Sequence, residues 1–167
     1  MYAANIWKYY VYRSLIALDL TLSVFVLFEM AQGLSMTQVM LLETIYIGIV
    51  LALEVPSGAF ADTYGRKLSV GLAIIMATLG MVIFGFSNGF LIFFIGQVMF
   101  GIGMAMESGA DSALIYDTLI ELDREGDYDE VYGKANSISL ITWAIAALLS
   151  GWLATFLDYQ ILFFMTA

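Results

Sequence analysis

The sequence contains no cysteine and no histidine, and these two absences exclude several kinds of chemistry. Without cysteine, the 167 residues offer no disulfide, no thiolate nucleophile and no thiolate metal ligand. Without histidine, the usual proton carrier near neutral pH is missing, so a proton relay would have to use carboxylates. We therefore expect no catalytic residue, no metal site and no cofactor, and we predict that the chain is not an enzyme.

Proline and charged residues are also scarce. The chain has one proline and 13% charged residues, whereas 62% of its residues are hydrophobic and its mean hydropathy is +0.90. A soluble domain of this length has no way to bury so much apolar surface, so lipid must surround most of the chain. The composition predicts an all-α membrane protein that has the lipid bilayer as its main partner.

Three uncharged runs are each long enough to cross a hydrocarbon core of ~30 Å as a helix. They are residues 68–86, 89–106 and 135–157. Two further runs contain acids but are too apolar for a soluble amphipathic helix, and they cover residues 14–31 and 37–60. The pattern predicts five complete transmembrane helices and the truncated start of a sixth at 159–167.

The basic residues fall on one side of this predicted topology. All six precede the first span or lie in the connections between spans two and three or four and five: Lys8, Arg13, Arg66, Lys67, Arg124 and Lys134. By the positive-inside rule, that side and the N-terminus are cytoplasmic. We expect a multi-pass protein of the cytoplasmic membrane, most simply a bacterial inner membrane.

This topology divides the chain into four segments. Residues 1–11 form a cytoplasmic segment. Near its end, Trp7, Tyr9, Tyr10 and Tyr12 resemble an interfacial aromatic belt that leads into the first helix. Residues 12–120 hold helices one to four, residues 121–134 form an acidic cytoplasmic linker, and residues 135–167 hold helix five and the start of helix six. The linker contains "ELDREGDYDE", a main source of the net charge of −9, and it lacks the ligand spacing of a calcium loop.

A glycine and charge motif connects predicted spans two and three. It reads "GAFADTYGRK", with Gly58, Asp62, Gly65, Arg66 and Lys67 at fixed spacing. This motif resembles the loop between helices two and three of the major facilitator superfamily, whose pattern is Gly-x-x-x-Asp-Arg/Lys-x-Gly-Arg-Arg/Lys. The sequence departs from it at Thr63, where the family usually has a basic residue.

The resemblance implies the N-terminal half of a secondary transporter in which two six-helix halves alternate about a central site. It further implies a C-terminal half as partner, a small-molecule substrate and, where transport is coupled, protons. In the family this loop helps hold the halves together on the cytoplasmic side, and its arginine pairs with an acid at the end of helix four. The implied conformational latch consists of Gly58, Asp62, Gly65, Arg66, Lys67 and Asp117.

A second family feature is only partly present. Many proton-driven drug exporters carry Arg-x-x-x-Gly-x-Gly in helix four, and the matching stretch "QVMFGIG" has Gln97, Gly101 and Gly103. Proton-driven efflux, symport and facilitated diffusion of a metabolite all stay open, with efflux preferred because an acidic cavity suits cationic drugs. The alternative from another class is a truncated, non-transporting fragment or a membrane interaction module.

Several acids lie within the apolar spans, where an ionised carboxylate costs ~3 kcal/mol or more at mid-bilayer. With a helical rise of about 1.5 Å per residue, Asp19 and Glu107 approach the middle of the membrane. Asp111 follows Glu107 by one helical turn on the same face. These three are our candidates for cavity lining or proton coupling, the alternative being hydrogen bonds in helix packing. Glu29 and Glu43 are expected near the outer surface.

Overall fold

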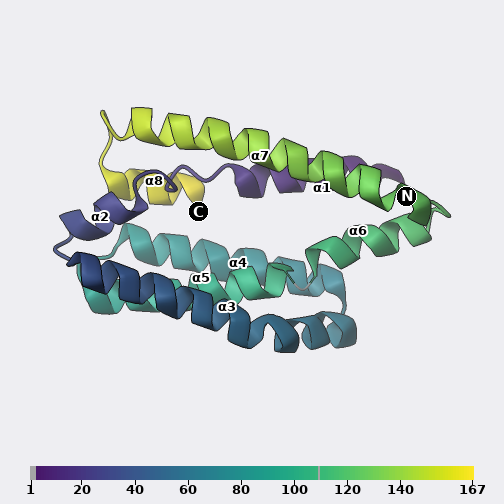
Figure 1. Ribbon diagram of the computed structural model, residues 1–167, viewed down its shortest axis with the longest axis horizontal. Helices are drawn as coiled ribbons and strands as arrows, with labels where there is room; N and C mark the ends of the chain where they lie inside the picture. Colours follow the sequence, from purple (N-terminus) through teal and green to yellow (C-terminus); the bar gives the residue numbers. More distant parts are fainter. Residues whose placement is uncertain (1–2, 109) are drawn as a thin grey trace.

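The computed structural model describes residues 3–108 and 110–167, which fold into eight α-helices and one short 3-10 helix (Figure 1). This confirms the all-helical prediction for the described part of the chain. The elements in chain order are α1 (Ala3–Ala17), α2 (Phe25–Ala31), α3 (Met36–Tyr64), α4 (Arg66–Gly85), α5 (Phe90–Ser108), α6 (Asp111–Ile120), η1 (Glu125–Asp127), α7 (Tyr128–Leu153) and α8 (Tyr159–Thr166).

The helices form two groups that run along the long axis of the molecule. Figure 1 shows α3, α4 and α5 on one side, and α1, α2, α7 and α8 on the other. Within the second group α1 packs against α7, where the hydroxyl oxygens of Ser14 and Thr142 lie 3.2 Å apart. The groups meet where α8 packs on α4. They also meet through α6, which contacts α1 of one group and α4 of the other. A buried aromatic cluster that includes Phe28, Phe84 and Phe163 fills the space at the α2 end.

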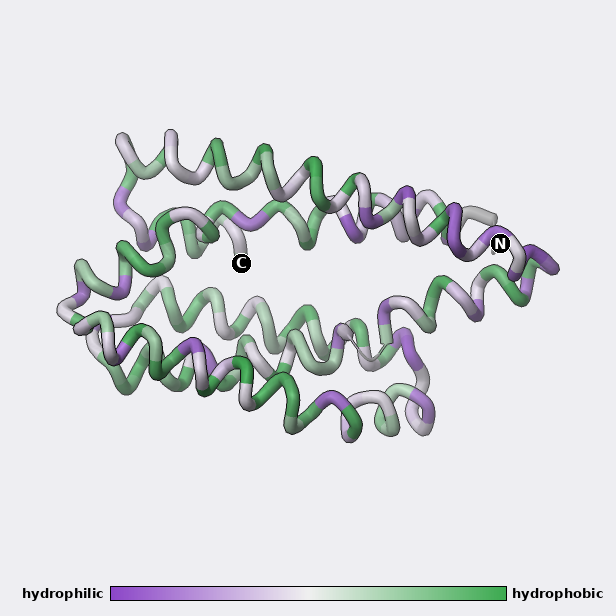
Figure 2. Tube along the Cα trace, viewed as in Figure 1, coloured by the Kyte–Doolittle hydropathy of each residue, from purple (hydrophilic) through white to green (hydrophobic). Residues whose placement is uncertain are grey.

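Two ends of the bundle differ in polarity. The start of α1, the α3–α4 junction and the α6–α7 connection lie at one end, and the α2–α3, α4–α5 and α7–α8 connections lie at the other (Figure 1). Hydrophilic colouring is densest at the first of these ends (Figure 2). We call it the basic end, because all six Lys and Arg residues belong to the elements that meet there.

Close packing of α5 on α4 and on α3 explains the retained glycines of the helix-four motif. A Cβ atom on Gly103 would lie 2.7 Å from the Ala77 backbone nitrogen and 2.8 Å from the Ala73 carbonyl oxygen. A Cβ on Gly101 would lie 3.1 Å from a methyl carbon of Ile49 in α3. Small residues of this kind let membrane helices approach backbone to backbone.

The predicted count of five complete spans is not confirmed. Four stretches in the described residues are long and apolar enough to cross a membrane, namely Met36–Tyr64, Arg66–Gly85, Phe90–Ile120 and Glu125–Leu153. The predicted first span at 14–31 is instead divided into α1 and α2, with residues 18–24 outside both helices. Asp19 causes a local turn there, since its Oδ1 accepts hydrogen bonds from the Thr21 backbone N–H at 2.7 Å and hydroxyl at 2.6 Å.

Three other boundaries differ from the sequence prediction. The motif at 58–67 is not an open loop, because α3 continues to Tyr64 and α4 begins at Arg66. The linker predicted at 121–134 is helical from Tyr128 onward, since α7 extends beyond its apolar run. The N-terminal segment is helical from Ala3, so α1 includes residues that we placed outside the membrane.

Candidate functional site

The charged residues of the glycine motif come together at the basic end. Arg66, the first residue of α4, places its Nε 2.6 Å from Oδ2 of Asp117 in α6. The Nη2 atom of the same guanidinium lies 3.5 Å from Oδ1 of Asp62, one turn earlier in the chain near the end of α3. Arg66 therefore connects α6 with the end of α3.

This charge cluster, made of Asp62, Arg66 and Asp117, is open to solvent. The side chains of Arg66 and Asp117 are 29% and 49% exposed, and that of Asp62 is 71% exposed. Exposed ion pairs contribute about 0–1 kcal/mol, so these contacts break and re-form easily. The Asp62 carboxylate also has unused acceptor positions, because its one charged contact in the described residues is long.

Gly65 is the residue that turns the chain from α3 into α4. Its φ of +99° lies in the region that residues with a Cβ rarely adopt, so a glycine is required at this position. Gly58, by contrast, has nothing within 4 Å of a Cβ built on it. The absence of a side chain at Gly58 is therefore not explained by packing within the described residues.

Lys67 stands apart from the rest of the motif. It is exposed and makes no ion pair with any residue in the described ranges, whereas Arg66 beside it contacts both acids. The six residues that the resemblance groups together thus divide into a charge cluster, two glycines and a separate lysine.

A second polar cluster joins α1 to α6 and contains Asp111. Arg13 Nη1 lies 2.9 Å from Asp111 Oδ2, and Tyr9 donates a hydrogen bond of 3.1 Å to the same oxygen. The side chains of Arg13 and Asp111 are 20% and 6% exposed, so this is a largely buried ion pair. The sequence predicts Arg13 and Tyr9 as residues of the membrane surface, and nothing in it indicates that they pair with Asp111.

Glu107 lies beside this pair but in a different helix from Asp111. Tyr12 donates a hydrogen bond of 3.3 Å to Glu107 Oε1. Glu107 lies in the last turn of α5 and Asp111 is the first residue of α6, and residue 109 between them lies outside the described residues. That the two share one helical face stays a prediction, but both side chains contact α1, Glu107 through Tyr12 and Asp111 through Tyr9 and Arg13.

Two acids lie toward the end opposite the basic end, and the sequence does not show what surrounds them. Gln97, buried at the motif's arginine position, donates a hydrogen bond of 3.3 Å to Glu43 Oε1 in α3. Glu29 in α2 is fully buried within the protein, and neither carboxylate oxygen has a hydrogen-bond partner among the described residues. Glu29 is buried because the predicted first span is divided into α1 and α2 and α2 packs separately. The hydropathy of the sequence does not reveal this division.

A family comparison agrees with this arrangement. The family model described as Major Facilitator Superfamily matches residues 11–167. The chain belongs to the major facilitator superfamily. The match confirms the resemblance seen in residues 58–67, and members of this superfamily are transporters rather than enzymes. No solved structure matches the chain. No three His, Cys, Asp or Glu side chains in the described ranges are placed to hold a metal ion.

Proposed function

We propose that this chain forms the N-terminal half of a secondary transporter that moves a small molecule across the cytoplasmic membrane by alternating access. The observation that carries the proposal is the ion pair of 2.6 Å between Arg66 of the cytoplasmic motif and Asp117 of α6, in a chain that belongs to the superfamily. The substrate class that suits this acidic membrane segment best is a cationic or amphipathic compound moved outward. In this orientation the basic end faces the cytoplasm.

The charge cluster acts in this proposal as a conformational latch. Arg66 fixes the position of Asp62 at the end of α3, and the exposed carboxylate of Asp62 accepts a contact from the C-terminal half in one state of the cycle. Because exposed ion pairs are weak, the latch opens without a large barrier. Gly65 sets the tight turn that brings Asp62 and Arg66 to the same place.

Glu107 is the carboxylate that best suits proton coupling. It is half-buried and accepts one long hydrogen bond, from Tyr12, whereas Asp111 is already paired with Arg13 and Asp19 is used in a local turn. Other titratable groups that interact electrostatically with Glu107 are Arg13, Asp111 and Tyr46. Replacement by Gln should therefore flatten the pH profile of transport, while Asp19→Asn, which keeps the accepting Oδ1, should leave the profile unchanged.

The proposal is tested by efflux of ethidium from cells that carry the full chain, meaning a transporter with both halves. Cells with the wild-type protein should retain several-fold less dye than cells without it, and Asp62→Asn should abolish that difference while membrane insertion stays normal. Asp129→Asn is the matched control, because it removes an exposed acid of the basic end that makes no ion pair among the described residues. Dye retention equal to that of empty cells would contradict efflux, and normal efflux by Asp62→Asn would contradict the latch.

A further inference from the structure

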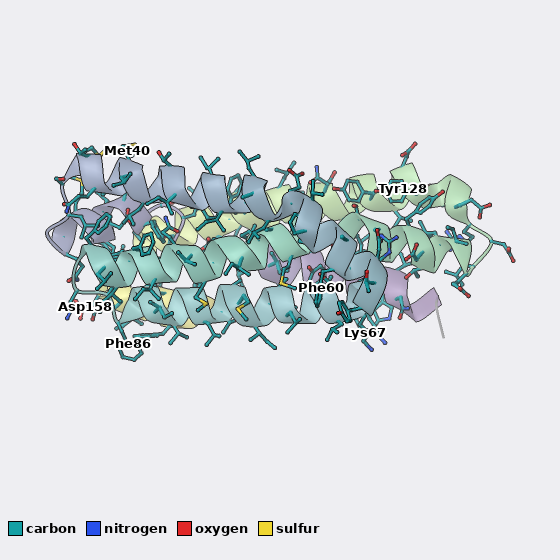
Figure 3. All side chains as sticks on the ribbon, turned by 90° about the horizontal axis from the view of Figure 1, so that it is seen from below. Met40, Phe60, Lys67, Phe86, Tyr128 and Asp158 are labelled. Carbon is teal, nitrogen blue, oxygen red and sulfur yellow. The ribbon has the colours of Figure 1, made fainter. Side chains whose placement is uncertain are left out.

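Lys67 is the one residue of the glycine motif whose charge the latch does not use. It lies at the start of α4, on the side of the bundle seen in Figure 3, with Phe86 near the other end of the same helix. Arg66 contacts Asp62 and Asp117, but no acid of the described residues lies within ion-pair distance of Lys67. An exposed ammonium group at the basic end therefore lacks an anionic partner within this part of the chain.

A shallow, open groove lies beside Lys67, between the α3–α4 junction and one face of α4. Its volume is about 530 Å³, and its lining is mainly apolar, with Leu68, Leu72 and Ile75 at successive turns of α4. Gly71 is one of its lining residues, and a Cβ at this position would meet nothing within 4 Å. The groove is open since a glycine stands where a side chain would otherwise fill it.

The surroundings of the groove determine what fits it. α4 is long and apolar enough to cross a membrane, so the part of the groove beyond the first turn should face hydrocarbon. Tyr64, which is exposed at the mouth, has the amphipathic ring typical of the membrane–water interface. A ligand must therefore have an anionic group for Lys67 and a long apolar part for the groove, which is the chemistry of an anionic phospholipid.

We propose that this groove binds one anionic glycerophospholipid, whose phosphate contacts the Lys67 ammonium group and whose acyl chain lies over Gly71. The lipid would sit beside the latch without touching Asp117, because Asp117 pairs with Arg66 and does not line the groove. A zwitterionic lipid binds more weakly, because its own ammonium or choline group partly cancels the attraction to Lys67.

The test counts lipids bound to the purified full chain by native mass spectrometry, after titration with phosphatidylglycerol or phosphatidylcholine. Lys67→Gln should weaken binding of the first tightly held phosphatidylglycerol about five-fold, the effect expected of one lysine at an anionic surface. Gly71→Phe, which fills the groove, should weaken it at least as much. Phosphatidylcholine binding should be unchanged by Lys67→Gln.

Two matched controls separate this site from general attraction between a basic surface and anionic lipid. Lys8→Gln removes another exposed lysine of the basic end, and Gly48→Phe adds the same ring to an open position of α3. Both should bind phosphatidylglycerol as the wild type does. The proposal is overturned if Lys67→Gln binds phosphatidylglycerol as tightly as the wild type, or if Lys8→Gln weakens binding to the same extent.

Discussion

At the scale of residues, the charged side chains form an exposed cluster around Arg66 and a largely buried pair of Arg13 with Asp111. The resemblance of residues 58–67 to a known family motif was sufficient to single out Asp62 and Arg66, and it implied Asp117 as their partner. The pairing of Arg13 with Asp111 was not predictable, since the partners are far apart in the chain and Arg13 equally suits a cytoplasmic anchor. Buried pairs of this kind depend on how helices pack, and a single sequence does not encode that visibly.

The Arg13–Asp111 pair should behave as a buried ion pair. Asp111→Asn or Arg13→Met alone should destabilise the protein by about 3–5 kcal/mol, because each leaves one buried charge without its partner. The double variant Arg13→Met/Asp111→Leu should recover most of that loss. Thermal unfolding of the purified protein in detergent measures both effects.

The exposed pair Lys134–Glu130 provides the control for this measurement. Its atoms are only 2.6 Å apart, but its side chains are 62% and 68% exposed, so Glu130→Gln should leave the unfolding temperature unchanged. Equal effects of Asp111→Asn and Glu130→Gln on the unfolding temperature would show that burial of the Arg13–Asp111 pair does not change its contribution to stability.

Glu29 should tolerate loss of its charge. Its carboxyl is fully buried and neither oxygen is hydrogen-bonded within the described residues, so ionisation there would be unfavourable. Glu29→Gln keeps the shape of the side chain and should leave the unfolding temperature unchanged or raise it. A clear drop would mean that the ionised form of Glu29 is bound by a partner that stabilises the fold.

At the scale of elements, long uncharged runs were reliable predictors and interruptions were not. The runs at 68–86 and 89–106 correspond closely to α4 and α5. The break between α1 and α2 was missed because residues 18–24, "LDLTLSV", remain apolar while Asp19 and Thr21 form a turn. Hydropathy measures whether a segment prefers lipid, whereas a local side-chain hydrogen bond decides whether it stays helical.

The contact between α4 and α5 should depend on Gly103. Gly103→Ala places a methyl group 2.7 Å from the Ala77 backbone, and backbone atoms do not move aside cheaply, so the unfolding temperature should fall. Gly48→Ala is the matched control, because it makes the same change in a helix with nothing within 4 Å of the new Cβ. That variant should be as stable as the wild type or slightly more so, since alanine favours helix. Equal behaviour of both variants would contradict close packing at Gly103.

At the scale of the whole molecule, the distribution of basic residues and the order of helices both indicate that the helix bundle has two distinct ends. The absence of cysteine from these residues makes the orientation simple to test with single introduced thiols. In intact cells, a membrane-impermeant maleimide should label Asn88→Cys, in the α4–α5 connection, but not Gly126→Cys, in η1. Both positions should react after the membrane is broken. Labelling of Gly126→Cys in intact cells would reverse the proposed topology.

The latch is tested most directly by the accessibility of Val55 in the full chain, measured from the cytoplasmic side. Val55 is 81% exposed within this half and precedes Asp62 by two turns of α3. We expect a cysteine at position 55 to react slowly with an impermeant maleimide in everted vesicles, because the closed latch keeps water from this depth. With Asp62→Asn or Asp117→Asn added, the rate should rise several-fold, whereas Asp129→Asn should leave it unchanged. Identical rates in all four proteins would contradict the account.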